Sequence, residues 1–286
     1  MKTEHDEPSL MLLVPDVIVE ADWLNENLEN SNLIILDATI KKAINSSEVD
    51  SNQQQIKNAI FFDLKNVFSV QKAEFPNTVL DADTFQYETQ KLGINKDSCI
   101  VVYDDLGIYS SPRVWWLFKL MGFQNIAVLN GGFPVWKTNS FPIESKKNPI
   151  LKKGNFISKC QPNLSITKEE ILNSLSDTAT KVIDARSHNR FIGVDPEPRK
   201  GLPSGRIPGS LNIPYVKVLN DFTLKSKVGL EAIIKPYESE SRVVFSCGSG
   251  ITASILALAF SYVKKINYAV YDGSWTEWGS DISTPK

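Results

Sequence analysis

The fold is encoded most clearly by residues 243–254, which read Val243-Val244-Phe245-Ser246-Cys247-Gly248-Ser249-Gly250-Ile251-Thr252-Ala253-Ser254. The apolar, β-branched start predicts a buried strand, and the apolar run at 255–262 predicts a helix. The loop between them places the Cys247 thiol at the carboxyl end of a strand and at the mouth of a helix. Backbone N–H groups in such a loop attract an anion, which favours the thiolate. Cys247 is therefore a candidate nucleophile, and the alternative is a buried structural cysteine.

Composition narrows the classes of protein. The chain has 286 residues, a net charge of -2 and 42% hydrophobic residues, which suits one large or two modest domains. This charge gives no reason to expect nucleic acid or an anionic membrane as a partner. The three cysteines, without short metal spacing, argue against a disulfide framework or a zinc site and fit a reducing compartment.

The amino-terminal segment, residues 1–15, carries a short apolar run at 10–14. That run is too short to span a membrane, and the segment lacks the basic start and cleavage pattern of a signal peptide. Its acidic character disfavours a mitochondrial presequence. We therefore expect a cytoplasmic protein without membrane partners, and we expect a monomer.

The chain repeats its pattern at a spacing of roughly 140–150 residues, which is a domain-sized duplication. Three segments of the first half answer to three of the second: 33–38 to 182–186, 100–104 to 243–247, and 127–136 to 269–278. Each half also opens with a helix-like segment, residues 21–28 and 167–175, the second capped by Ser165 or Thr167. Short strands alternating with helices predict an α/β fold of two tandem domains, each a mainly parallel sheet with helices on both faces.

We place a non-catalytic domain at 1–145, a solvated lysine-rich linker at 146–164 and a catalytic domain at 165–286. In the first half, Asp104 stands where Cys247 stands in the second, and an aspartate cannot act as a sulfur nucleophile. The loop 104–108 that follows it is also not expected to gather N–H groups around an anion. The first domain is therefore expected to supply one wall of a cleft.

These features together resemble the two-domain rhodanese-type sulfurtransferases. The resemblance covers residues 19–278 and rests on the tandem halves, the loop 247–252 and the segment 271–275. Thiosulfate-preferring members of that family carry Cys-Arg-Lys-Gly-Val-Thr in the loop, and 3-mercaptopyruvate sulfurtransferases carry Cys-Gly-Ser-Gly-Val-Thr. The chain matches the second form with Ile251 in place of valine, so the resemblance implies 3-mercaptopyruvate as the sulfur donor.

The resemblance also implies a site for that donor. Residues 184–191, 197–199 and 205–210 are similar to the family pattern Asp-Ala-Arg…Arg-Phe…Glu-Pro-Arg…Gly-His-Ile-Pro-Gly. By this match, Arg190 and Arg199 hold the carboxylate and carbonyl of the substrate, and a guanidinium fork suits a carboxylate. Without Cys247 nearby, two surface arginines would be the default interpretation. Arg186 is interpreted as a structural ion-pair partner.

The implied mechanism is a ping-pong sulfur transfer. The Cys247 thiolate takes the sulfur as a persulfide, pyruvate leaves, and a thiol, a thioredoxin-like protein or cyanide then accepts the sulfur. Ser249 or water is expected to protonate the leaving enolate, and no metal or organic cofactor is expected. Backbone N–H groups of the loop are expected to stabilise the anionic sulfur. They belong to Gly248, Ser249, Gly250, Ile251 and Thr252.

One departure from the family affects its proton relay, in which a histidine links an aspartate to the loop serine. Asp63 matches that aspartate, but Asn77 stands in the segment that matches the histidine, and the chain has only His5 and His188. Asparagine can hydrogen-bond but cannot shuttle a proton at neutral pH. Either the relay is dispensable, or water, Ser249 or His188 replaces it, or the enzyme is slow.

Three rival functions remain open. A thiosulfate sulfurtransferase differs only in its donor. A phosphatase of the Cys-x5-Arg type is disfavoured, because Ala253 stands where its arginine would be. A persulfide carrier without turnover would explain the missing histidine. Cys99 and Cys160 are expected to be inert.

Overall fold

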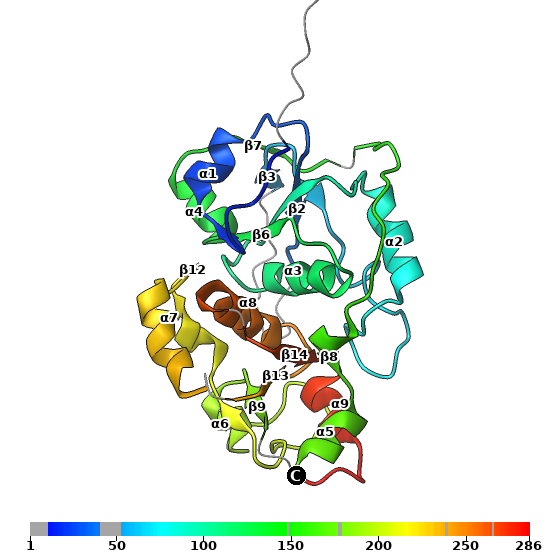
Figure 1. Ribbon diagram of the computed structural model, residues 1–286, viewed down its shortest axis with the longest axis vertical. Helices are drawn as coiled ribbons and strands as arrows, with labels where there is room; N and C mark the ends of the chain where they lie inside the picture. Colours follow the sequence, from blue (N-terminus) through cyan, green and yellow to red (C-terminus); the bar gives the residue numbers. More distant parts are fainter. Residues whose placement is uncertain (1–10, 41–52, 148, 177–178, 238–239, 265) are drawn as a thin grey trace, which may run out of the picture.

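The computed structural model describes residues 11–40, 53–147, 149–176, 179–237, 240–264 and 266–286. They form two α/β domains that lie one above the other in Figure 1, the first from blue to green and the second from green to red. Each domain is built around a five-stranded sheet. Within these residues, no helix has the length and apolar character needed to cross a membrane.

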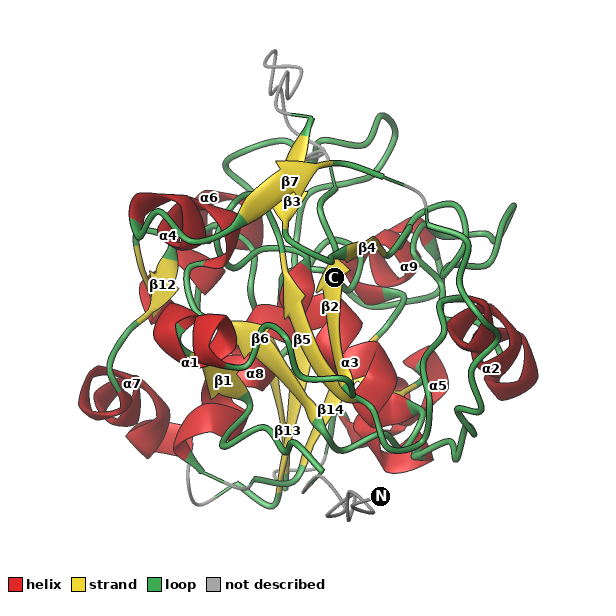
Figure 2. Ribbon diagram, turned by 90° about the horizontal axis from the view of Figure 1, so that it is seen from above, coloured by secondary structure: helices red, strands yellow, loops and turns green. Residues whose placement is uncertain are grey.

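The first domain has the strand order β1-β6-β5-β2-β4, and all neighbouring strands are parallel. These strands are β1 (Ile18–Val19), β6 (Ile126–Leu129), β5 (Cys99–Tyr103), β2 (Leu33–Asp37) and β4 (Ile60–Phe61). The helices around them are α1 (Ala21–Glu26), α2 (Ala82–Lys91), α3 (Ser111–Leu120) and α4 (Gly132–Thr138). A small antiparallel pair, β3 (Gln54–Ile56) with β7 (Ile143–Ser145), lies beside the sheet. Figure 2 looks down on this domain and shows its strands between the helices.

The second domain repeats this plan with the order β10-β9-β13-β14-β8, again all parallel. Its strands are β10 (Leu211–Asn212), β9 (Thr180–Asp184), β13 (Arg242–Ser246), β14 (Tyr268–Tyr271) and β8 (Ser165–Ile166). Its helices are α5 (Lys168–Ser174), α6 (His188–Phe191), α7 (Lys227–Ile234), α8 (Ala253–Val263) and α9 (Ser274–Ser280). Three short 3₁₀ turns, η1 (Pro162–Leu164), η2 (Tyr215–Val218) and η3 (Lys235–Tyr237), and the pair β11 (Leu219–Asn220) with β12 (Thr223–Leu224) complete it.

The predicted duplication and fold class are confirmed, because the strand order of one sheet maps onto that of the other. The paired segments predicted from the sequence become β2 and β9, β5 and β13, and β6 and β14. Thr167 is the N-cap of α5: its side chain accepts the Glu170 N–H, while the Glu170 carboxylate accepts the Thr167 N–H. Such a reciprocal capping box satisfies two backbone donors that the helix itself leaves unpaired.

The domains share one hydrophobic core. Helices α3 and α8 pack against each other between the two sheets (Figure 1), and both are apolar almost all round. A helix of that kind is stable only when it is buried on every side. The largest core cluster accordingly runs from Trp115 and Phe118 on α3 to Leu256 and Phe260 on α8. The interface is therefore closer to a domain interior than to a hinge.

The segment 146–164 between the domains is bound to the first domain. Its lysines, such as Lys152 and Lys153, are exposed as expected. Its backbone is not simply solvated, however, because Phe156 is buried against Phe85 and Phe118 of the first domain. Backbone bonds such as Phe156 N–H to Ile94 O, at 3.1 Å, fix its path. The apolar Phe156 side chain is the physical reason for the difference.

Candidate active site

The candidate nucleophile lies at the bottom of a cavity between the domains. This cavity has a volume of about 810 Å³ and its lining includes Cys247. Cationic side chains also line it, Lys65 and Lys72 from the first domain and Arg190, Arg199 and Lys217 from the second. The first domain thus supplies one wall, as predicted, and the cavity is suited to an anionic ligand.

The loop 247–252 carries the thiol from the end of β13 to the start of α8. Gly250 in this loop has φ = 79°, a left-handed conformation that glycine adopts without steric cost. A Cβ atom at Gly250 would lie 2.8 Å from Nη1 of Arg113, which comes from the first domain. Glycine is therefore required at this turn by its conformation and by its neighbour.

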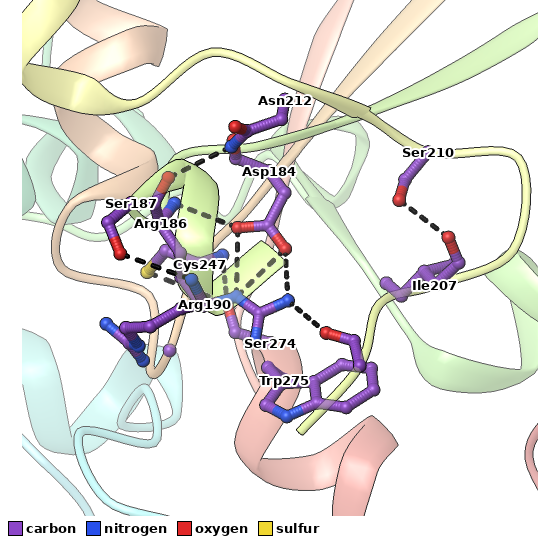
Figure 3. Close-up of polar contacts among 12 residues, drawn as sticks. Asp184, Arg186, Ser187, Arg190, Ile207, Ser210, Asn212, Cys247, Ser274 and Trp275 are labelled. Carbon is purple, nitrogen blue, oxygen red and sulfur yellow. Dashed lines mark hydrogen bonds and ion pairs between the residues drawn. The ribbon is translucent and has the colours of Figure 1, made fainter. Parts of the chain in front are cut away.

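A second loop, which follows β14 and leads to Ser274, bonds to Cys247. The Cys247 N–H donates to Ser274 Oγ at 3.1 Å (Figure 3). Ser274 Oγ in turn donates to the Tyr271 carbonyl at 2.7 Å. The same Oγ lies 4.0 Å from the Cys247 sulfur. Ser274 has φ = 51°, an uncommon conformation for a residue with a side chain. The sequence pointed to this segment but not to a role for Ser274.

Arg186 forms a buried ion-pair network, as predicted. Its Nε and Nη2 donate to the Asp184 carboxylate at 2.7–3.1 Å (Figure 3). Its Nη1 donates to the Glu197 carboxylate at 2.7 Å. The guanidinium also lies 4.7 Å from the ring centre of Trp275. Through these contacts the Arg186 guanidinium links the end of β9, at Asp184, to the segments that carry Glu197 and Trp275.

Arg190 and Arg199 meet beside the nucleophile's loop. A Cβ atom at Gly248 would lie 3.1 Å from Nη2 of Arg190 and 3.8 Å from Nη1 of Arg199. Arg190 is held by two bonds to Glu197, and Arg199 donates to Thr276 Oγ1 at 3.1 Å. Burial lowers the pKa of Arg199, and the neighbouring Arg190 charge lowers it further, whereas a thiolate at Cys247 raises it. An anion placed between the two guanidinium groups would be stabilised by both.

Asn77 reaches the loop serine. Its Nδ2 lies 3.1 Å from both the carbonyl and the Oγ of Ser249 and donates to them. The structure does not bring Asp63 to this pair: the Asp63 carboxylate instead accepts the backbone and side-chain N–H groups of Asn66 at 3.0–3.1 Å. Asn77 thus contacts the loop serine, while Asp63 supports its own turn.

Two further polar groups line the cavity, and of these only His188 was named from the sequence, as one possible replacement for the relay histidine. Tyr109 lines the cavity, and burial raises its pKa to about 12, so that its hydroxyl stays protonated near neutral pH. His188 also lines the cavity, with Nδ1 3.3 Å from Asn212 Oδ1. Arg113, which does not line the cavity, was not predicted either, although a charge in the middle of an apolar helical pattern is a signal that could have pointed to it.

The expectation for the Asp104 loop was wrong. The Asp104 carboxylate is buried and accepts N–H groups from Tyr109, Ser110 and Ser111 at 2.8–2.9 Å. The start of α3 therefore does gather donors around an anion, because the first N–H groups of a helix have no partner within it. In this domain the anion is the chain's own carboxylate, which leaves no place for a substrate.

The remaining cysteines lie apart from the cavity lining. Cys99 is buried in β5, and burial raises its pKa to about 12, which keeps the thiol protonated. Cys160 is exposed in the segment between the domains. In the part of the chain that the structure describes, no three His, Cys, Asp or Glu side chains are grouped so that they could hold a metal ion.

The rhodanese-like domain model matches this chain twice, at residues 20–139 and 167–281. The chain belongs to the rhodanese family. Each matched range contains four of the five strands of one sheet, and the fifth, β1 or β8, ends directly before the range begins. The duplication seen in the sequence is therefore a duplication of the rhodanese domain. Its relatives are sulfurtransferases by name, and this rhodanese is a transferase of that class.

Relatives align with the rhodanese over nearly its whole length. It is 34% identical to thiosulfate/3-mercaptopyruvate sulfurtransferase 2 of Arabidopsis thaliana, over 94% of this chain and 85% of the relative. It is 31% identical to the 3-mercaptopyruvate sulfurtransferase of Escherichia coli K12, over 93% and 96%. The crystal structure of SseA from Escherichia coli matches with a TM-score of 0.80 at 28% identity, covering 91% of this chain and 99% of that one. Tum1 of Saccharomyces cerevisiae matches with a TM-score of 0.82 at 27% identity, over 92% and 94%.

Proposed function

We propose that this rhodanese transfers sulfane sulfur from 3-mercaptopyruvate, through a persulfide on Cys247, to a thiol or to cyanide, and releases pyruvate. The proposal rests on the position of Arg190 and Arg199 beside Gly248. The loop 247–252 itself contains no cationic side chain. Two guanidinium groups suit the carboxylate and carbonyl of an α-keto acid. The sulfur of such a donor then lies toward the Cys247 thiolate.

In the first step, the Cys247 thiolate attacks the donor sulfur and an S–S bond forms. The carbon–sulfur bond of the donor breaks, and its electron pair leaves with the carbon as the enolate of pyruvate, which takes up a proton. In the second step, the acceptor attacks the outer sulfur and the S–S bond breaks, which returns the Cys247 thiolate. Loop N–H groups from Gly248 to Thr252 stabilise the anionic sulfur in both steps.

Ser249 is the proton donor that we propose for the enolate. Asn77 donates to the Ser249 oxygen, so the hydroxyl hydrogen is free to point to another acceptor. Asparagine does not titrate, so the proton must be replaced by water. Asp63 was expected to join this relay; we assign it the supporting role that its bonds to Asn66 indicate.

Thiosulfate is the second candidate donor. Thiosulfate sulfurtransferase of Mus musculus is 33% identical over 91% of this chain, and two arginines beside the loop would also suit a dianion. A thioredoxin-like acceptor, a monomeric state and a cytoplasmic location remain proposals of the same kind.

The test is release of thiocyanate with cyanide as the acceptor, comparing 3-mercaptopyruvate with thiosulfate and using Cys247→Ser as the control. We expect a higher kcat/KM for mercaptopyruvate and no turnover in the variant. A higher kcat/KM for thiosulfate would assign the other donor. Uptake of sulfur on Cys247 without turnover would describe a persulfide carrier.

A further inference from the structure

Arg113 is the only arginine in residues 1–145, and its side chain is fully buried at the domain interface. It projects from α3, where its neighbours on the helix, such as Val114 and Trp116, are apolar. A buried charge is costly unless it is paired and hydrogen-bonded. The contacts of this guanidinium therefore indicate which parts of the structure it stabilises.

The Arg113 guanidinium binds three loops at once. Its Nη2 donates to the Asn77 carbonyl at 2.8 Å and to the Asp272 carboxylate, and its Nη1 donates to the Gly250 carbonyl at 3.5 Å. The Cζ atom of Arg113 lies 4.5 Å from the ring centre of Trp116. The Asp272 carboxylate in turn accepts the Val79 N–H at 2.9 Å, which adds a second link between the domains.

Each of the three loops carries a group of the sulfur site. Gly250 belongs to the nucleophile's loop, and its carbonyl accepts hydrogen bonds from Arg113 and from Ser254 Oγ, which lies at 3.0 Å. Asn77 holds Ser249, and Asp272 lies two residues before Ser274, which accepts the Cys247 N–H. Arg113 itself is absent from the cavity lining, so it does not touch a ligand there.

We propose that Arg113 is a positioning residue, which holds the loop 247–252 in the shape that gathers backbone N–H groups around the Cys247 sulfur. The first domain is then a working part of the sulfur site and not only one of its walls. The inference rests on the proposed function, since it assigns to that site a residue from the other domain. Lysine could pair with Asp272, but it lacks the planar fork that reaches two loop carbonyls as well.

The test compares two variants with a matched control. Arg113→Lys keeps the charge and loses the fork. The double variant Arg113→Met with Asp272→Asn removes both charges, so that no buried charge is left unpaired to unfold the chain. Arg242→Lys is the control, because Arg242 likewise donates to two backbone carbonyls, those of Asn163 and Ser165, away from the loop. Tm, kcat and KM with 3-mercaptopyruvate and cyanide are measured for each.

A second readout does not depend on the sulfur donor. Iodoacetamide alkylation is followed by mass spectrometry at each cysteine separately. The alkylation rate of Cys247 measures how the loop 247–252 affects the reactivity of its thiol. Exposed Cys160 measures the activity of the reagent, and alkylation of buried Cys99 would show that the first domain has loosened. If wild-type protein fails to turn over mercaptopyruvate, the proposed function fails, while alkylation still tests the role of Arg113.

We expect kcat to fall by about 10²-fold in Arg113→Lys with KM near that of wild type, because a small displacement of reacting groups costs that much. Alkylation of Cys247 should slow relative to Cys160, with Cys99 still protected. The double variant should recover Tm but not kcat. Wild-type kcat and Cys247 reactivity in either variant would overturn the inference, since Arg113 would then only neutralise Asp272. If Cys99 becomes reactive in Arg113→Lys, the first domain has loosened and that variant is set aside. The kcat and the Cys247 reactivity of the double variant then decide between the same two outcomes.

Discussion

Gly250 offers a sharp test of the loop geometry, through the substitution Gly250→Ala. The left-handed conformation at φ = 79° costs a residue with a side chain about 1–2 kcal/mol. The new methyl group would also lie 2.8 Å from Nη1 of Arg113 and 3.1 Å from the Asp272 carbonyl. Arg113 cannot withdraw easily, because it is bonded on the far side, and overpacking of this kind costs about 1–3 kcal/mol.

We therefore expect Gly250→Ala to destabilise the protein by about 2–5 kcal/mol in total. Thermal unfolding should show this as a drop in Tm of roughly 2–4 °C per kcal/mol. The loop N–H groups should also lose their alignment on the sulfur, so kcat for thiocyanate release should fall by about 10²-fold.

Gly248→Ala is the matched control in the same loop. Gly248 is not among the glycines with positive φ, and its Cβ would meet only the guanidinium groups of Arg190 and Arg199 at 3.1 and 3.8 Å. We expect a Tm near that of wild type and a raised KM for 3-mercaptopyruvate, because Arg190 must move. Equal Tm and kcat for Gly250→Ala and wild type would refute the argument that this turn shapes the site.

Three further outcomes are expected. Asn77→His should add an inflection near pH 6.5 to the kcat profile, because a titrating group then contacts Ser249, and an unchanged profile would remove Ser249 from the proton path. Arg199→Lys should raise KM for 3-mercaptopyruvate by about 10–100-fold, the value of a lost charged hydrogen bond, and an unchanged KM would contradict its role in binding. Burial raises the pKa of Cys99 from 9.0 to about 12, so the stability that its neutral thiol contributes is present below pH 9 and is lost as the pH rises toward 12. Cys99→Ala should accordingly lose less Tm than wild type between pH 8 and pH 10, and equal losses would show that Cys99 does not titrate in this way.

The sequence predicted the fold well because its signals are local. The three central strands of each sheet contain an apolar run, such as the run before Cys247, and each of these strands has a counterpart in the other half of the chain. The position of Arg190 and Arg199 followed from a resemblance that spans the same domain.

The contacts between the domains could not be predicted in this way. Arg113, Asn77 and Ser249 are far apart in the chain, and only the packing of α3 on α8 brings them to one point. The failure at Asp104 has a similar origin. The donors to its carboxylate are main-chain N–H groups, and their direction depends on the turn and not on the residue types.

Asp104 of the first domain and Cys247 of the second lie at the same point of the same fold, directly after β5 and β13. In the first domain, three N–H groups at the start of α3 bind the carboxylate of Asp104. In the second, the loop before α8 presents Cys247, and no carboxylate fills its place. Because backbone donors at a helix start do not distinguish a carboxylate from a sulfur anion, the difference lies in the single side chain at the strand end. The first domain thereby has no nucleophile at this point, and its α3 instead carries Arg113, which bonds to the loops around the sulfur site of the second.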